Sequence, residues 1–171
     1  MTKILLAILL HSLSGVYDFT LTANDQSTIH LSDYSGKRIL IVNTATGSPY
    51  ASQYGDLETL YQQNKDSLVI IAVPSNSFGD EPNADSAINN TVQTTYGIHY
   101  VLAAKSVVTG IDQLSLYSWL TSFDQNGMFG SGLKGSFQKF LIDSQGKLVG
   151  VFAPSVSPLG DEMSNALKNN P

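Results

Sequence analysis

The chain has no cysteine among its 171 residues. This absence excludes disulfide scaffolds, thiolate zinc sites, iron–sulfur clusters and thiol-based redox chemistry. Charged residues are also scarce, at 13% of the chain against about a quarter in an average protein. The nine Lys and Arg residues and the net charge of -5 argue against nucleic acid as a partner, because phosphate binding needs a clustered basic face.

Histidine is rare too, and no two histidines have the spacing of a helical metal site. The three are His11, His30 and His99. We therefore expect neither a metal nor a cofactor. Hydrophobic residues, in contrast, make up 42% of the chain, and a chain of this length buries about 70% of the surface that its unfolded form exposes. That is enough for one core, so we expect a single domain over residues 15–171.

Residues 1–14 have the pattern of an export signal. Lys3 supplies a positive charge, residues 4–10 form an apolar run, and Ser12 and Ser14 are small residues at a suitable cleavage position. The run is too short to span a membrane, so we expect no integral membrane contact. A short first helix or a wrongly assigned start are the alternatives. If the signal is cleaved, the protein is periplasmic or secreted, and otherwise it is cytoplasmic.

The rest of the chain alternates strand-like and helix-like segments. Alternating or continuous apolar runs predict strands at residues 16–21, 29–31, 39–42, 68–73, 99–102, 140–142 and 148–152. Apolar residues at helical spacing predict helices around residues 54–61, 84–96, 114–120 and 163–167. We expect the runs at 39–42 and 68–73 to be parallel neighbours joined by the first helix. A turn at 143–146 needs a positive φ at Gly146. The predicted fold is α/β, with a central mixed β-sheet and helices on both faces.

Short motifs follow one another along the chain in a definite order. They are VYDF at 16–19, GKRILIVN at 36–43, Gln53-Tyr54 with Leu57-Glu58 and Leu60-Tyr61, Phe78-Gly79 with Glu81-Pro82, Tyr96-Gly97, Leu116-Tyr117 with Trp119-Leu120, FQKFL at 137–141, Ala153-Pro154 and Ser157-Pro158-Leu159. In this order and spacing the sequence resembles the glutathione peroxidase family, which are thiol peroxidases with a thioredoxin-like fold. The resemblance covers nearly all of the chain after residue 15. It implies that fold, and it implies a peroxide and a thiol reductant, glutathione or thioredoxin, as partners.

The resemblance also locates the family's catalytic positions, and each carries a different residue here. The family's loop N-V-A-S-x-C-G corresponds to residues 43–49, which read NTATGSP, so Ser48 stands at the peroxidatic Cys or selenocysteine. The family's F-P-C-N-Q-F-G corresponds to residues 73–79, VPSNSFG, with Ser77 at the catalytic Gln. The family's W-N-F corresponds to GSF, with Gly135 and Ser136 at its Trp and Asn.

These replacements predict the loss of peroxidase chemistry. Peroxide reduction needs a nucleophile that ionises near neutral pH and gains oxygen reversibly, as a cysteine thiolate does. A serine hydroxyl does neither. Loss of the Trp, Gln and Asn side chains also removes donors that would stabilise a charged intermediate. We therefore expect a pseudoenzyme, to which binding of peroxide and thiol reductant is doubtful.

Two explanations are considered for the origin of the serines at these positions, and two for the role of Ser48. Engineered removal of cysteine would explain Ser48 and Ser75, where relatives often have Cys, but not the changes at Ser77, Gly135 and Ser136, so natural divergence is favoured. A hydrolytic role for Ser48 would need a base and an oxyanion hole, and the sequence shows neither a G-x-S-x-G motif nor a nearby His. A serine followed by proline is instead a preferred helix start, and we favour that role.

Other polar or aromatic residues have structural interpretations. His99 lacks an identifiable partner and is expected to be packed or at the surface. Trp119 is expected in the core. Asp80-Glu81 could bind a cation, although such pairs are usually solvated, and Asn89-Asn90-Thr91 is a formal glycosylation sequon. Two function classes remain, a member of the peroxidase family without activity and a non-enzymatic exported binding or interaction module.

Overall fold

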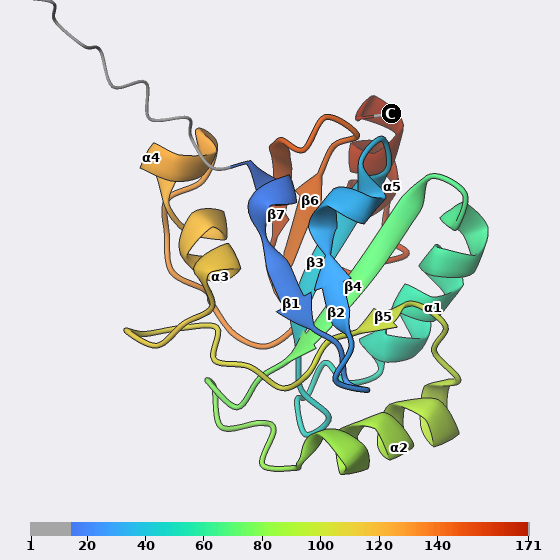
Figure 1. The fold of residues 1–171 in the computed structure, drawn as a ribbon. Helices are drawn as coiled ribbons and strands as arrows, with labels where there is room; N and C mark the ends of the chain where they lie inside the picture. Colours follow the sequence, from blue (N-terminus) through green and yellow to red (C-terminus); the bar gives the residue numbers. More distant parts are fainter. Residues whose placement is uncertain (1–14, 171) are drawn as a thin grey trace, which may run out of the picture.

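The computed structural model describes residues 15–170, so the export signal expected over residues 1–14 lies outside the described residues. A five-stranded mixed sheet forms the centre of the molecule (Figure 1). In spatial order its strands are β5 Val101–Leu102, β4 Leu68–Pro74, β3 Arg38–Thr44, β6 Lys139–Ile142 and β7 Leu148–Phe152. β3, β4 and β5 run parallel, while β6 and β7 pair antiparallel with their neighbours. Every residue of β3 and β4 is buried, as continuous apolar runs predict for strands covered on both faces.

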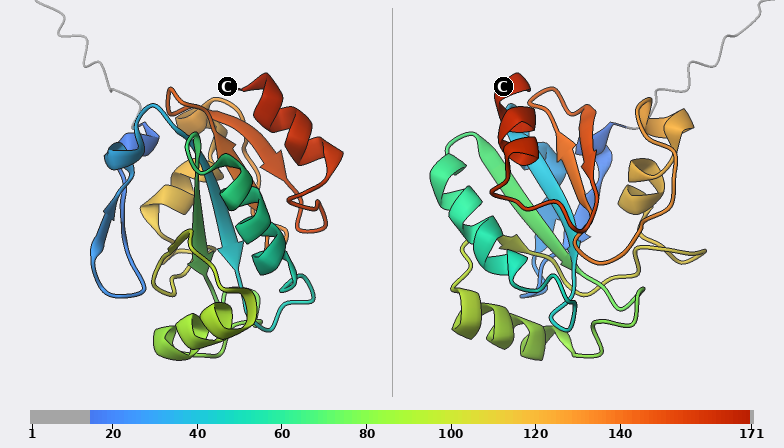
Figure 2. Two further views of the ribbon diagram at one scale, coloured as in Figure 1. Left: turned by 90° about the vertical axis from the view of Figure 1, so that its right-hand side faces the viewer. Right: turned by 180° about the vertical axis from the view of Figure 1, so that it is seen from behind.

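Helices cover both faces of this sheet (Figure 2). The other elements are α1 Gln53–Asn64, α2 Asp85–Tyr96, α3 Ser115–Leu120, α4 Phe123–Asn126, α5 Asp161–Asn169 and the hairpin of β1 Thr20–Thr22 and β2 Thr28–His30. Leu40 and Ile70 point into one apolar cluster with side chains of α1, α2 and α5. Ile41 and Ile71 point into a second cluster with α3 and the hairpin. The prediction of an α/β fold with a mixed sheet and helices on both faces is confirmed.

Two of the predicted strands are shorter than expected. Residues 16–18 form a 3-10 turn, η1 Val16–Asp18, because the Asp18 carboxylate accepts a hydrogen bond from the Gly15 N–H at 3.0 Å and holds the chain in a turn. A second 3-10 turn, η2 Leu31–Tyr34, directly follows β2. The edge strand β5 leaves out His99, whose backbone N–H donates to the Glu58 carboxylate on α1 at 2.7 Å instead of entering the sheet.

The second hairpin agrees with its prediction. β6 and β7 pair antiparallel, and Gly146 in their turn has a φ of 83°, which glycine adopts without steric cost. No helix within residues 15–170 combines the length and the apolar character needed to cross a membrane.

Candidate functional site

Three loops meet at the end of the sheet where β3 and β4 finish and β6 begins (Figure 1). Carboxyl ends of parallel strands lie at the same edge of a sheet, and the antiparallel β6 starts at that edge. A depression of about 260 Å³ opens between these loops. Its lining includes Ser48, Tyr50, Asp80, Lys134, Gly135 and Ser136. The structure therefore brings three of the four expected site residues together.

Ser48 lies in the turn after β3 and is only 7% exposed. Its Oγ accepts a hydrogen bond from the Tyr50 backbone N–H at 3.2 Å. The expected helix start at Ser48 is wrong, because α1 begins at Gln53. Consecutive backbone turns fill the interval, such as the one closed by the Ala51 N–H and the Ser48 carbonyl at 3.0 Å. The hydroxyl therefore supports a turn before the helix and does not cap the helix itself.

Gly135 and Ser136 are fixed against the end of β3. The Asn43 amide donates to the Gly135 carbonyl at 2.9 Å, and the Phe137 N–H donates to the Asn43 carbonyl. The Ser136 hydroxyl donates to the Asp80 carboxylate at 3.2 Å. The loop before β6 is thus attached both to β3 and to the loop after β4.

Ser77 does not line the depression, unlike the other three expected residues. Its Oγ accepts hydrogen bonds from the Ser75 hydroxyl at 3.0 Å and from the Val108 N–H at 3.1 Å. These bonds direct Ser77 toward the segment after β5. Sequence order alone gives no indication of that direction.

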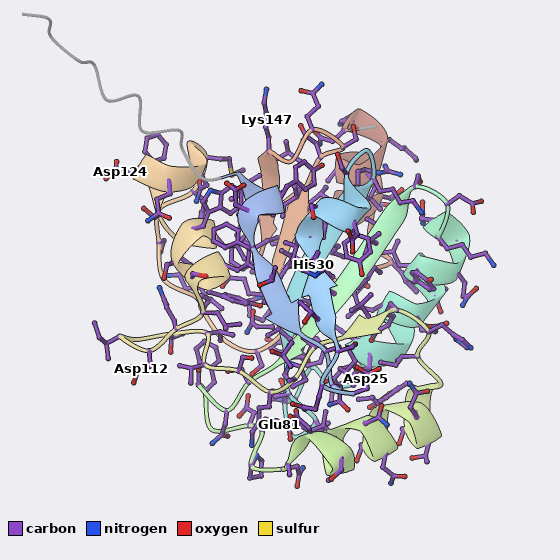
Figure 3. All side chains as sticks on the ribbon, viewed as in Figure 1. Asp25, His30, Glu81, Asp112, Asp124 and Lys147 are labelled. Atoms are coloured by element: carbon purple, nitrogen blue, oxygen red, sulfur yellow. The ribbon has the colours of Figure 1, made fainter. Side chains whose placement is uncertain are left out.

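Glu81 has a structural role that the sequence analysis did not predict. It is fully buried, so the expectation of a solvated acidic pair is wrong for this residue. Its carboxylate accepts hydrogen bonds from the Thr46 N–H at 2.6 Å and the Thr46 hydroxyl at 2.9 Å, and also from the Asn83 amide at 3.2 Å. Figure 3 shows Glu81 among the loops at this end of the sheet. A carboxylate with several donors is satisfied without a cation.

Glycine is required at position 47 by a close approach of the same two loops. The Gly47 N–H donates to the Asp80 carbonyl at 3.0 Å. A Cβ at this position would lie 2.6 Å from that carbonyl oxygen, a distance that side chains do not tolerate. The loop after β3 is therefore held to the loop after β4 through both Gly47 and Thr46.

Lys139 places an ammonium group behind the depression. The residue is fully buried, and its Nζ donates to the carbonyls of Phe137 at 2.8 Å and Pro154 at 3.3 Å. Burial lowers the pKa of Lys139 to about 8, although the Asp56 carboxylate opposes that effect. The signal for this site was available in the sequence as a lysine directly before the apolar run at 140–142.

The structural interpretation holds for Trp119 and only in part for His99. Trp119 is 3% exposed and lies in the core, as expected. His99 is at the surface, with 71% of its side chain exposed, but the expectation that it lacks a partner is wrong. Its Nδ1 lies 2.8 Å from a Glu58 carboxylate oxygen. Burial of Glu58 favours its neutral form, but hydrogen bonds from Gln62 and His99 outweigh burial and lower its pKa.

No histidine lines the depression, and its ionisable lining residues are Tyr50, Asp80 and Lys134. Within residues 15–170, no three His, Asp or Glu side chains converge as metal ligands would. The arrangement offers hydroxyl groups, one carboxylate and one ammonium group to a small polar molecule.

Comparison with known proteins identifies the family. The family model described as glutathione peroxidase matches residues 16–121. The chain belongs to the glutathione peroxidase family. It is 37% identical over 146 residues to the glutathione peroxidase homolog BsaA of Staphylococcus aureus strain MW2, covering 84% of this chain and 92% of that protein. It is 34% identical over 154 residues to a glutathione peroxidase of Lactococcus lactis, covering 89% and 96% of the two chains.

Solved structures show the same relationship at the level of the fold. The crystal structure of Trgpx in its apo form aligns with a TM-score of 0.70 at 29% identity, over 92% of this chain and 97% of that chain. A thioredoxin-family thiol:disulfide interchange protein of Chlorobium tepidum aligns with a TM-score of 0.64 at 18% identity, over 89% and 92%. The predicted thioredoxin-like fold is therefore confirmed.

Proposed function

We propose that this member of the glutathione peroxidase family no longer reduces peroxides. The proposal depends on Ser48, which stands where the family resemblance puts the peroxidatic residue, in a chain without cysteine. A serine oxygen does not form the sulfenic acid that a thiol reductant must later reduce. Peroxide reduction therefore has no covalent intermediate available at this position.

The surroundings of Ser48 support the proposal. Deprotonating a hydroxyl at neutral pH needs a base within hydrogen-bond reach. The Ser48 hydroxyl accepts a hydrogen bond from the Tyr50 backbone N–H. The carboxylate in the depression, Asp80, is bonded to Ser136. The absence of a thiol and of a hydrogen bond from the Ser48 hydroxyl to a carboxylate within residues 15–170 supports the proposal.

The direct test is a peroxidase assay on the full-length protein. Hydrogen peroxide is supplied with glutathione or with thioredoxin, each regenerated by its reductase, and NADPH consumption is followed. We expect no turnover above a heat-denatured control. Sustained turnover with either reductant would overturn the proposal.

A cysteine variant tests whether the residues around position 48 still activate a thiol. In Ser48→Cys, a thiolate sulfur would attack one peroxide oxygen, the O–O bond would break, and the leaving hydroxide would take up a proton to give water and a sulfenic acid. We expect this oxidation, measured by mass spectrometry, to be no faster than in Ser86→Cys, which places a thiol at an exposed position on α2. Faster oxidation of Ser48→Cys would show that the depression still activates a thiol.

A second candidate function is ligand binding outside the cytoplasm by the retained scaffold. The depression supports it, because Asp80 and Lys134 give its lining both charges. Small polar metabolites should raise the melting temperature of the protein, and Ser155→Trp, which fills the depression from an exposed lining position, should abolish the shift. No shift with any metabolite would count against this function.

The export itself has a separate test. Recovery of the intact N-terminus on cytoplasmic protein would contradict it.

A further inference from the structure

A groove of about 580 Å³ lies between the end of α1, the start of β3 and α5. Its volume is within the range of about 300–1,000 Å³ that is typical of ligand sites. Arg38, in this groove, is the first residue of β3, whereas Ser48 follows the last. At about 3.3 Å per residue, the strand separates the two sites by about 20 Å. The groove is therefore independent of the depression around Ser48.

Arg38 is a buried cation in the wall of this groove. It is 9% exposed, and its guanidinium donates to the Leu167 carbonyl and, at 2.7 Å, to the Ser67 hydroxyl. Both acceptors are neutral, and no carboxylate of residues 15–170 pairs with Arg38. Arginine is rarely buried without an ionic partner, and a guanidinium has five N–H donors. Donors and charge are therefore left for an anion.

Neighbouring groups do not neutralise the positive charge of the Arg38 guanidinium. The Leu167 carbonyl lies in the last turn of α5, where the helix dipole favours a cation, but that dipole is only a partial charge. Burial alone lowers the pKa of Arg38, with no nearby carboxylate to oppose it. The exposed Lys168 adds a second cation, and no Asp or Glu lines the groove, although the chain has 14 acidic and 9 basic residues.

The remaining wall of the groove combines apolar side chains with the polar residues Gln63, Asn64 and Ser164. Leu60 and Leu167 are buried on the protein side, and Leu159 leaves 45% of its surface exposed at the groove. An anionic head with an aliphatic tail matches the two cations and the leucine side chains of this lining. A guanidinium matches the planar geometry of a carboxylate with two parallel hydrogen bonds.

We propose that this groove binds a fatty carboxylate of medium chain length. The carboxylate pairs with Arg38 and Lys168, and the alkyl chain lies along Leu60, Leu159 and Leu167. Binding at this site needs no chemistry at Ser48, so it is independent of whether the protein reduces peroxides.

The test is calorimetric titration of the full-length protein with decanoate below its micelle concentration. We expect saturable binding at one site, with decan-1-ol and acetate each at least about tenfold weaker, because each lacks one half of the recognition. Decyl phosphate distinguishes the head group, and it should not bind more tightly than decanoate. Tighter binding of decyl phosphate would overturn the assignment to a carboxylate.

Variants test the location of the site. Lys168→Glu reverses the charge at an exposed groove position and should weaken decanoate about fivefold. Lys147→Glu makes the same change at the β6–β7 turn, outside the groove lining (Figure 3), and should leave the affinity unchanged. Leu159→Asp should weaken binding as well, while Arg38→Gln, checked for folding by thermal melting, should weaken it most.

Three results would overturn the proposal. One is the absence of decanoate binding, and another is equal binding of decan-1-ol. The third is equal loss of affinity in Lys168→Glu and Lys147→Glu, which would indicate a general charge effect.

Discussion

At the scale of single residues, Lys139 is an ammonium group enclosed by the core. Its pKa of about 8 lies below the usual 10.5 because burial disfavours the charged form. Two backbone carbonyls accept its hydrogen bonds, so the proton is held but at a cost in desolvation. The unfolded chain therefore binds this proton more tightly than the folded protein does.

This difference predicts a pH dependence of stability. Between pH 8 and about 10 the unfolded state binds more protons, so the free energy of unfolding should rise with pH, by at most about 1.4 kcal/mol per unit. Above that range the buried hydroxyls of Tyr54, Tyr100 and Tyr117, whose pKa values are raised by burial, act in the opposite direction. Urea denaturation at pH 7, 8, 9 and 10 measures the slope. Lys139→Met should remove it, and Lys147→Met, at an exposed position, should retain it. A slope that persists in Lys139→Met would contradict the interpretation.

At the scale of elements, the loops around the depression are joined by buried polar bonds. Glu81 from the loop after β4 holds the Thr46 N–H and hydroxyl of the loop after β3. Asn43 at the end of β3 holds the loop before β6. The shape of the depression therefore depends on a few hydrogen bonds between segments distant in sequence.

Glu81→Gln tests this connection. The amide has one acceptor oxygen in place of two, so one of the Thr46 and Asn83 hydrogen bonds is lost together with the charge that strengthens the others. We expect a loss of about 1–3 kcal/mol in the free energy of unfolding, measured by urea denaturation at pH 7. Glu162→Gln, an exposed position on α5, should change stability by less than about 0.5 kcal/mol. Equal effects of the two substitutions would show that Glu81 does not secure the loop.

The elements differ in how far the sequence predicts them. β3 and β4 are predictable because their apolar runs have no other stable position than a sheet covered on both faces. The loop directions are not, because Ser77 turns toward Val108 through a tertiary contact that leaves no local pattern. Ser48 and Pro49 favour a helix start locally, yet the bond from Tyr50 to the Ser48 hydroxyl makes a turn.

At the scale of the whole molecule, one sheet supports both apolar clusters. Neighbouring residues of β3, such as Leu40 and Ile41, point to opposite clusters. A loss of packing in either cluster therefore disturbs the backbone of β3, which both clusters share. The candidate site and the groove beside Arg38 lie at opposite ends of this shared strand.

The shared sheet predicts that the described domain unfolds as one cooperative unit. Trp119 reports on the cluster that contains α3, while Leu57, fully buried on α1, belongs to the opposite cluster. Leu57→Ala removes buried contacts and should cost about 2–5 kcal/mol. If the two faces are coupled through β3 and β4, the urea transition followed by Trp119 fluorescence must shift together with the transition followed by far-ultraviolet circular dichroism. Ile111→Ala, at a side chain that is 99% exposed, should move neither transition by more than about 0.5 kcal/mol. A Trp119 transition unchanged by Leu57→Ala would mean that the two faces unfold separately, because the sheet would then not transmit the loss of packing from one cluster to the other.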